Sequence, residues 1–180
     1  FRRVLFRSNR LRLDLVLNDF VAGALVNREI SILSDGSPWR PMINTKDMAR
    51  AIDWGLSRKA SNGGKFLAVN TGSNQWNNRI LALAEAIESV IPGIKISLNP
   101  DAPPDKRSYR ANFDLFKSLA PNNQPQEDLI STVKEIHENL IGMNFSDGKF
   151  RESMYIRLRV LDNLQKIGML NSNLEWNRAN

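Results

Sequence analysis

Residue types that commonly carry out catalysis are scarce in this chain. It contains no cysteine and a single histidine, His137, which lies within Glu-Ile-His-Glu on a predicted helix. The composition therefore excludes disulfides, thiolate nucleophiles and thiolate metal sites. A Ser-His-Asp triad or a histidine-based metal site would depend on His137 alone, because no second ligand lies near it in the sequence. We expect a solvent-facing helix residue there and no metal site.

Arginine, aspartate and asparagine side chains offer binding chemistry instead. Arg40 follows a turn that contains Gly36 and Pro38, and a guanidinium is a planar fork of donors that suits phosphate oxygens. Carboxylates and amides suit hydroxyl groups because they accept hydrogen bonds, which amides also donate. Each candidate has a simpler interpretation as an exposed or turn-forming residue. The candidate binding residues are Arg40, Asp105, Arg107, Asn18 and Asn44.

The chain is basic, with a net charge of +6. A nucleic-acid-binding module would gather this charge on one face with interleaved aromatic residues. Arg2, Arg3 and Arg7 lie in the first eight residues, and without them 22 basic residues face 19 acidic ones, a net charge of +3. The remaining charge is spread out, so we expect no nucleic-acid partner. No apolar run approaches the roughly 20 residues that span a bilayer, so we expect no membrane insertion.

Apolar spacing predicts helices along most of the chain. The helix at residues 48–56 can be capped by Thr45 or Asp47, and a cap is a more frequent role for such an aspartate than ligand binding. Its inward face is expected to hold Met48, Ala51, Ile52 and Leu56. The predicted helices span residues 14–26, 48–56, 77–90, 113–119, 127–140 and 150–167.

Short apolar runs between turns predict strands at residues 30–33, 42–45, 66–70 and 94–98. Residues 66–70 form a near-continuous apolar run, which is typical of a buried parallel strand. Strands that alternate with helices indicate the α/β class, but so few strands do not complete a doubly wound sheet. We therefore expect part of a larger fold.

Three regions are expected along the chain. Residues 1–8 resemble the translation of a sequencing-adapter end, and we interpret them as an assembly artefact; a basic strand or a targeting segment is the alternative. Residues 9–145 carry the alternating strands and helices. Residues 146–180 form a helical carboxy-terminal extension.

Five segments together carry a family resemblance. They are residues 10–18, the Ser-Asp-Gly-Ser-Pro-Trp-Arg-Pro stretch within 34–51, the Phe-Leu-Ala-Val-Asn-Thr-Gly of 66–72, residues 105–112, and the ending at 155–176. Their order resembles that of the extended short-chain dehydrogenases/reductases, the NAD-dependent epimerases and dehydratases of nucleotide sugars. The resemblance implies the carboxy-terminal part of that fold, with a mostly helical substrate-binding region and a few strands, and residues 9–145 as its sugar-nucleotide-binding part.

The resemblance also implies roles for single residues. Arg40 would bind the nucleotide diphosphate, and Asp105 would bind the ribose or a neighbouring arginine. Ala102 stands where many relatives have an arginine, so Arg107 or Arg110 would have to supply that phosphate contact. In a further departure, an asparagine at position 44 replaces the usual histidine, and an amide cannot titrate near neutral pH.

Two motifs of the family are missing. The chain has no Gly-x-x-Gly-x-x-Gly, and it has no Tyr-x-x-x-Lys, because Phe113 follows Tyr109 and Arg159 follows Tyr155 at that spacing. The resemblance implies that the missing tyrosine and lysine carry out hydride transfer. We therefore expect a truncated enzyme that has no catalytic residue, binds neither NAD nor NADP and is inactive alone.

The full-length parent is expected to use NAD or NADP, to pass through a keto-sugar intermediate, and to be a cytoplasmic homodimer. A nucleotide-sugar reductase or another oxidoreductase of the family is an alternative. A small basic nucleic-acid-binding module, or a protein-interaction module built on the carboxy-terminal helix, is an alternative of another class.

Overall fold

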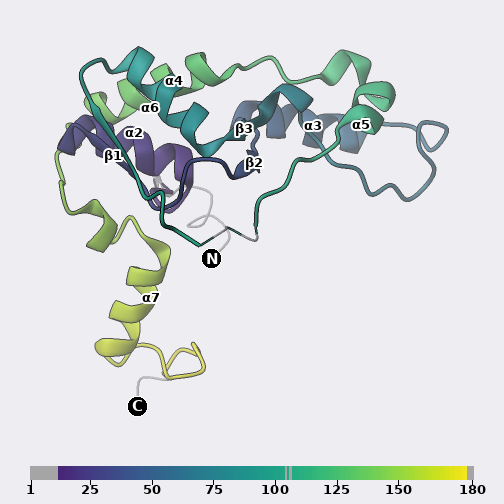
Figure 1. The fold of residues 1–180 in the computed structure, drawn as a ribbon. Coiled ribbons are helices and arrows are strands. Elements are labelled where there is room, and N and C mark those ends of the chain that lie inside the picture. Colours follow the sequence, from purple (N-terminus) through teal and green to yellow (C-terminus); the bar gives the residue numbers. More distant parts are fainter. Residues whose placement is uncertain (1–11, 104, 106, 178–180) are drawn as a thin grey trace.

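The computed structural model describes residues 12–103, 105 and 107–177 of the chain. Helices and two small pairs of strands form a body, and one helix projects away from it (Figure 1). The helices are α2 (Val16–Asn27), α3 (Thr45–Ser57), α4 (Ile80–Val90), α5 (Asp114–Leu119), α6 (Leu129–Gly142) and α7 (Arg157–Lys166), and the strands are β1 (Glu29–Ile32), β2 (Trp39–Pro41), β3 (Asn77–Arg79) and β4 (Lys95–Leu98).

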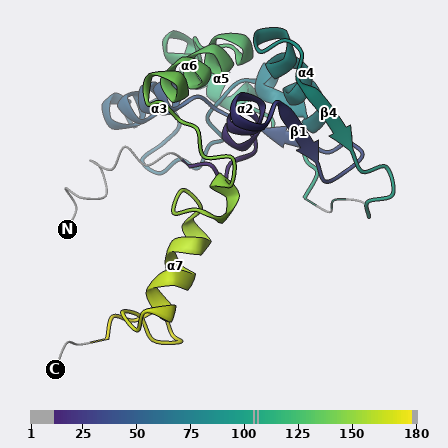
Figure 2. The same cartoon turned by 90° about the vertical axis from the view of Figure 1, so that its left-hand side faces the viewer.

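The main core lies between one strand pair and three helices. β1 pairs with β4 in parallel, with Glu29 opposite Lys95 and Ile32 opposite Leu98. Helices α2, α4 and α6 pack against one another, and α2 and α4 also contact β1 (Figure 2). Apolar side chains of these elements fill the space between them, including Val21, Leu83, Ile87, Val133 and Leu140, all fully buried. This core fixes the amino-terminal end of α2 beside the carboxyl end of β1.

A second strand pair and a second cluster complete the body. β2 pairs with β3 in the antiparallel sense, with Trp39 opposite Arg79. Helix α3 buries Trp54 against Phe116 of α5, with ring centroids 5.4 Å apart in an edge-to-face arrangement. This packing links α3 to α5 at the end of the body away from β1 (Figure 1).

Most of the predicted elements are confirmed, and the class is α/β as expected. The strand predicted at 42–45 is wrong in position. The strand lies at Trp39–Pro41, and Thr45 already begins α3. The apolar residues Met42 and Ile43 led to the later position, but β2 ends at Pro41, which pairs with Asn77, the first residue of β3.

The strand predicted at residues 66–70 is absent from the structure, and Phe66 is 87% exposed. A parallel strand needs a neighbour for its backbone hydrogen bonds. β1 pairs with β4 and β2 pairs with β3, each in a two-stranded sheet, and residues 66–70 join neither sheet.

The inward face predicted for α3 is also largely wrong. Ala51 is buried, but Ile52 is 58% exposed and Leu56 is 84% exposed, and Met48 is exposed as well. The face that packs carries Ala51 and Trp54. Helical periodicity identifies an apolar stripe but not the element that covers it.

The long helix predicted at residues 150–167 is broken into two pieces. Phe150–Glu152 forms a single 3-10 turn, and α7 begins only at Arg157. Gly168 follows α7 with a φ of +73°, in agreement with the predicted stop. Helix α7 buries none of its residues and points away from the body in both views (Figures 1 and 2). No helix among the described residues is long and apolar enough to cross a membrane.

Candidate functional site

A cavity of about 980 Å³ lies at the carboxyl end of β1, where the start of α2 and strand β2 meet Ala102, Pro103, Asp105 and Arg107. The carboxyl ends of parallel strands are a frequent place for ligands in α/β folds. Much of the wall is apolar and comes from separate elements, with Leu13, Leu15, Phe20, Ile32, Ile80 and Ile156 among the lining residues. Five of the six charged lining residues form two groups on different elements, and the sixth, Asp14, pairs with Arg12.

The first charged group centres on Arg40, the first candidate from the sequence. Its Nη2 lies 2.5 Å from Oδ2 of Asp105, and its Nη1 donates to the carbonyl oxygens of Trp39 and Arg107, both at 2.9 Å. Both side chains of the ion pair are about four-fifths buried. Several hydrogen bonds therefore hold the guanidinium in one orientation at the cavity wall.

Asp105 binds a second guanidinium, that of Arg107. Its Oδ1 accepts hydrogen bonds from the backbone N–H of Arg107 at 2.9 Å and from Nε at 3.0 Å. The hydrogen bonds from the side chain and backbone of Arg107, together with Arg40, hold the pKa of Asp105 well below its usual range. The Arg107 side chain remains 83% exposed. Two guanidiniums share one carboxylate, which leaves a local net charge of +1.

A tight turn positions Arg40. Gly36 has a φ of +82°, and a Cβ there would lie 2.9 Å from the Cβ of Leu81, so glycine is required by both conformation and space. The carboxylate of Asp35 accepts hydrogen bonds from the backbone and hydroxyl of Ser37. Ile80 donates its N–H to the carbonyl of Pro38 at 2.9 Å, which ties the end of the turn to the start of α4. β2 therefore leaves the turn in a fixed direction.

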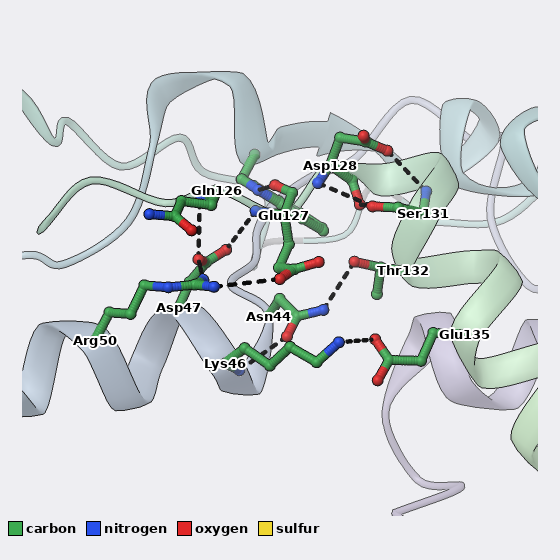
Figure 3. A network of polar contacts seen from close by, with 11 residues as sticks. Asn44, Lys46, Asp47, Arg50, Gln126, Glu127, Asp128, Ser131, Thr132 and Glu135 are labelled. Carbon is green, nitrogen blue, oxygen red and sulfur yellow. Dashed lines mark hydrogen bonds and ion pairs between the residues drawn. The ribbon is translucent and has the colours of Figure 1, made fainter.

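The other two candidates lie outside the cavity lining. Asn18 donates from Nδ2 to the carbonyl of Arg12 at 3.1 Å. Asn44 caps α3, because its Oδ1 accepts from the N–H of Lys46 at 2.9 Å, and its Nδ2 donates to Oγ1 of Thr132 at 2.9 Å (Figure 3). The structure thus brings together Arg40, Asp105 and Arg107, while Asn18 and Asn44 make local contacts. Their predicted role in substrate binding stays a prediction.

The polar network around Asn44 joins α3 to the segment that precedes α6. Asp47, whose side chain is fully buried, accepts hydrogen bonds from the backbone N–H groups of Gln126 at 2.9 Å and Glu127 at 3.2 Å (Figure 3). It also pairs with Arg50, one turn further along α3. Asp47 therefore serves as an interior anchor. The cap predicted at Thr45 or Asp47 is provided by Asn44 instead.

The second charged group of the cavity is an ion pair between Asp19 of α2 and Arg151 of the 3-10 turn. Nε and Nη2 of Arg151 donate to the two carboxylate oxygens at 2.7 and 2.8 Å. Sequence reasoning missed this pair because 132 residues separate its members and neither lies in a recognisable motif. Among the described residues, no group of acidic or histidine side chains could hold a metal ion.

The described residues do not fit a nicotinamide dinucleotide by themselves. A dinucleotide cradle requires a strand, a glycine-rich turn and the amino terminus of a helix in succession. β1 is followed by the turn at Ser34–Pro38 and then a strand, and the next helix after β4 begins only at Asp114.

No family model and no curated protein matches the sequence, but solved structures do. TunA, an NAD-dependent NDP-hexosamine 5,6-dehydratase involved in tunicamycin biosynthesis, matches with a TM-score of 0.61 and 16% identity over 73% of this chain and 41% of its own. A GalE-like L-threonine dehydrogenase from Cupriavidus necator matches with a TM-score of 0.55 and 19% identity over 68% of this chain and 44% of its own. An L-threonine dehydrogenase from Phytophthora infestans matches with a TM-score of 0.57 and 16% identity over 69% of this chain and 40% of its own.

These matches define the fold. The chain spans less than half the length of each of these enzymes and shares with them part of the extended short-chain dehydrogenase/reductase fold. The partial α/β fold expected from the sequence is thereby confirmed.

Proposed function

We propose that this chain is the substrate-binding part of an NAD-dependent epimerase/dehydratase, and that its cavity binds the nucleoside diphosphate of a nucleotide sugar. The observation that carries the proposal is the cluster of Arg40, Asp105 and Arg107 at the cavity wall. Two guanidiniums that share one carboxylate keep a net positive charge, and guanidinium forks match the oxygens of a diphosphate.

The fold and the cavity support the same proposal. One enzyme of this fold, TunA, acts on an NDP-hexosamine according to its description. The volume of about 980 Å³ lies at the upper end of the range for small-molecule sites, which leaves room for a ligand with several parts. The residues of this chain would bind and orient that ligand. Hydride transfer would require groups that the chain does not contain, so the cofactor, the homodimer and the cytoplasmic location belong to the parent enzyme in this proposal.

A second candidate ligand is an amino acid, because two other enzymes of this fold are L-threonine dehydrogenases. An amino acid carries one carboxylate and one ammonium group. The net positive wall around Arg40 suits the carboxylate, but an amino acid would leave most of a cavity of this size unfilled.

Isothermal titration of the chain near neutral pH tests both candidates. The ligands are UDP-N-acetylglucosamine, UDP, pyrophosphate and L-threonine, and the variant is Arg40→Ala. Charge-assisted hydrogen bonds contribute about 1.5–3 kcal/mol each, so we expect the variant to bind the nucleotides at least about tenfold more weakly. Arg159→Ala is the matched control, because Arg159 pairs with Asp162 in α7, outside the cavity. Equal nucleotide affinities in wild type and Arg40→Ala, or saturable binding of L-threonine alone, would contradict the proposal.

A further inference from the structure

The ion pair between Asp19 and Arg151 lies at the same cavity as the Arg40 cluster, yet it differs from that cluster in charge. Arg151 donates to both carboxylate oxygens of Asp19, so this pair is neutral overall. The Arg40 cluster has two cations for one carboxylate. A diphosphate is therefore expected at the cluster, and the neutral pair suits an uncharged polar part of the ligand.

Neighbouring residues fix the position of the Arg151 side chain. Its guanidinium lies over the ring of Phe150, 4.8 Å from the ring centroid, and Phe150 is fully buried. Within α2, a Cβ on Gly23 would lie 3.3 Å from Nη2 of Arg151 and 3.0 Å from the carbonyl oxygen of Glu29. Glycine inside a helix costs about 0.5–1 kcal/mol relative to alanine, and here it permits this close approach. The guanidinium of Arg151 is thus positioned by the Phe150 ring, the Asp19 carboxylate and the helix backbone at Gly23.

Hydrogen-bonding capacity remains on both partners. Arg151 uses Nε and Nη2 for Asp19, and its Nη1 makes no hydrogen bond to any described residue. Each oxygen of the Asp19 carboxylate accepts one of these bonds, and a carboxylate oxygen can accept two. The pair therefore keeps an unused donor on Arg151 and unused acceptor capacity on Asp19. The edge of a nucleobase, where an N–H adjoins a carbonyl or ring nitrogen, needs both kinds of group.

The surroundings of the pair also suit a base. Both residues line the cavity together with Phe20 of α2 and Ile156, the residue just before α7. A flat heterocycle buries its faces against apolar side chains and satisfies its edge with polar groups.

We propose that the Asp19–Arg151 pair reads the base of the nucleoside diphosphate whose diphosphate group binds at Arg40. This inference rests on the proposed function and adds a specificity-determining pair that joins α2 to the 3-10 turn. A merely structural role, in which the pair only ties the 3-10 turn to α2, would affect stability without changing the preference among bases.

The test compares UDP, CDP, ADP and GDP with pyrophosphate by titration of wild type and Arg151→Gln. We expect the wild type to prefer one base, and we expect Arg151→Gln to reduce the ratio of strongest to weakest nucleotide affinity about tenfold while pyrophosphate affinity stays unchanged. Arg159→Gln is the control and should keep the wild-type ratio. The exchange Asp19→Arg with Arg151→Asp retains an ion pair between the same elements and should still alter the ranking.

The outcomes separate this inference from the proposed function. Suppose that nucleotide binding depends on Arg40 but that the ranking of the bases is unchanged in Arg151→Gln and in the folded exchange variant. This result overturns the base-reading role and leaves the proposed function standing. Equal affinity of the wild type for all four nucleotides also overturns the base-reading role. If no nucleotide binds in an Arg40-dependent manner, both proposals fail. Thermal unfolding of each variant shows whether a loss of affinity reflects a loss of fold.

Discussion

Arg40 and Asp105 form an ion pair of 2.5 Å across 65 residues of sequence. The arginine comes from β2, and the aspartate comes from the proline-rich segment after β4. Their contact joins the antiparallel strand pair to the segment that leaves the parallel pair. It therefore sets the distance between two walls of the cavity.

The depressed pKa of Asp105 predicts how Asp105→Asn changes the pH dependence of stability. A carboxyl group whose pKa is lower in the folded chain than its ordinary value of 3.8 stabilises the fold above that value. The stabilisation is lost as the pH falls towards the folded pKa. We expect urea unfolding to show a difference between wild type and Asp105→Asn that is constant from pH 6 to 8 and shrinks below about pH 4.

Asp101→Asn is the control for this measurement, because Asp101 is an exposed residue of the same segment. It should show little difference from wild type at any of these pH values. A difference for Asp105→Asn that grows as the pH falls would contradict the assignment.

Asp47→Ala should be strongly destabilising. The substitution leaves the N–H groups of Gln126 and Glu127 and the guanidinium of Arg50 without their shared acceptor. Loss of one partner from such a buried group costs about 3–5 kcal/mol in unfolding free energy. Asp53→Ala, an exposed change on the same helix, should cost less than about 0.5 kcal/mol. Similar urea midpoints for the two variants would show that Asp47 is no anchor.

Two glycine substitutions should have opposite effects. Gly72 has a φ of +149°, and a Cβ there would lie 2.7 Å from the ring of the buried Phe113, so Gly72→Ala should cost about 2–4 kcal/mol. Gly55 lies inside α3 with nothing within 4 Å of its would-be Cβ, so Gly55→Ala should raise the unfolding free energy by about 0.5–1 kcal/mol. Urea unfolding of both variants measures the change in unfolding free energy. A destabilising Gly55→Ala would contradict the prediction.

Asn44→Ala separates a structural role from the substrate-binding role predicted from the sequence. The change removes the cap of α3 and the hydrogen bond to Thr132, which together should cost about 2 kcal/mol of stability. Because Asn44 lies outside the cavity lining, the UDP affinity of the folded variant should equal that of wild type. A tenfold loss of UDP affinity without unfolding would support substrate contact instead.

Local signals in the sequence predicted most helices and part of the site. Pro92 and Gly93 end α4 as expected, because helix ends depend on nearby residues. Arg40 and Asp105 could be identified from the sequence because each follows a turn or loop at a position with a recognisable family pattern. The sequence could not show that Arg107 would share the carboxylate of Asp105.

Features that depend on distant partners were not predictable. The apolar run at residues 66–70 was expected to form a buried strand, but a strand requires another strand beside it for its backbone hydrogen bonds. Asp19 and Arg151 carry no local mark, since only the packing of the 3-10 turn on α2 brings them together. The inward face of α3 was predicted wrongly because two side chains, the buried carboxylate of Asp47 and the indole of Trp54, decide which face packs.

Chemical-shift mapping with UDP most directly tests the claim that the cavity binds a nucleoside diphosphate. In ¹⁵N-labelled chain, the account predicts saturable shifts at the side-chain Nε–H of Arg40 and at the backbone amides of Arg107 and Val16, which surround the cavity. Arg159 in α7 should not respond. Shifts confined to Arg79 and Arg110 beside Trp39, or no saturable shifts at all, would contradict it.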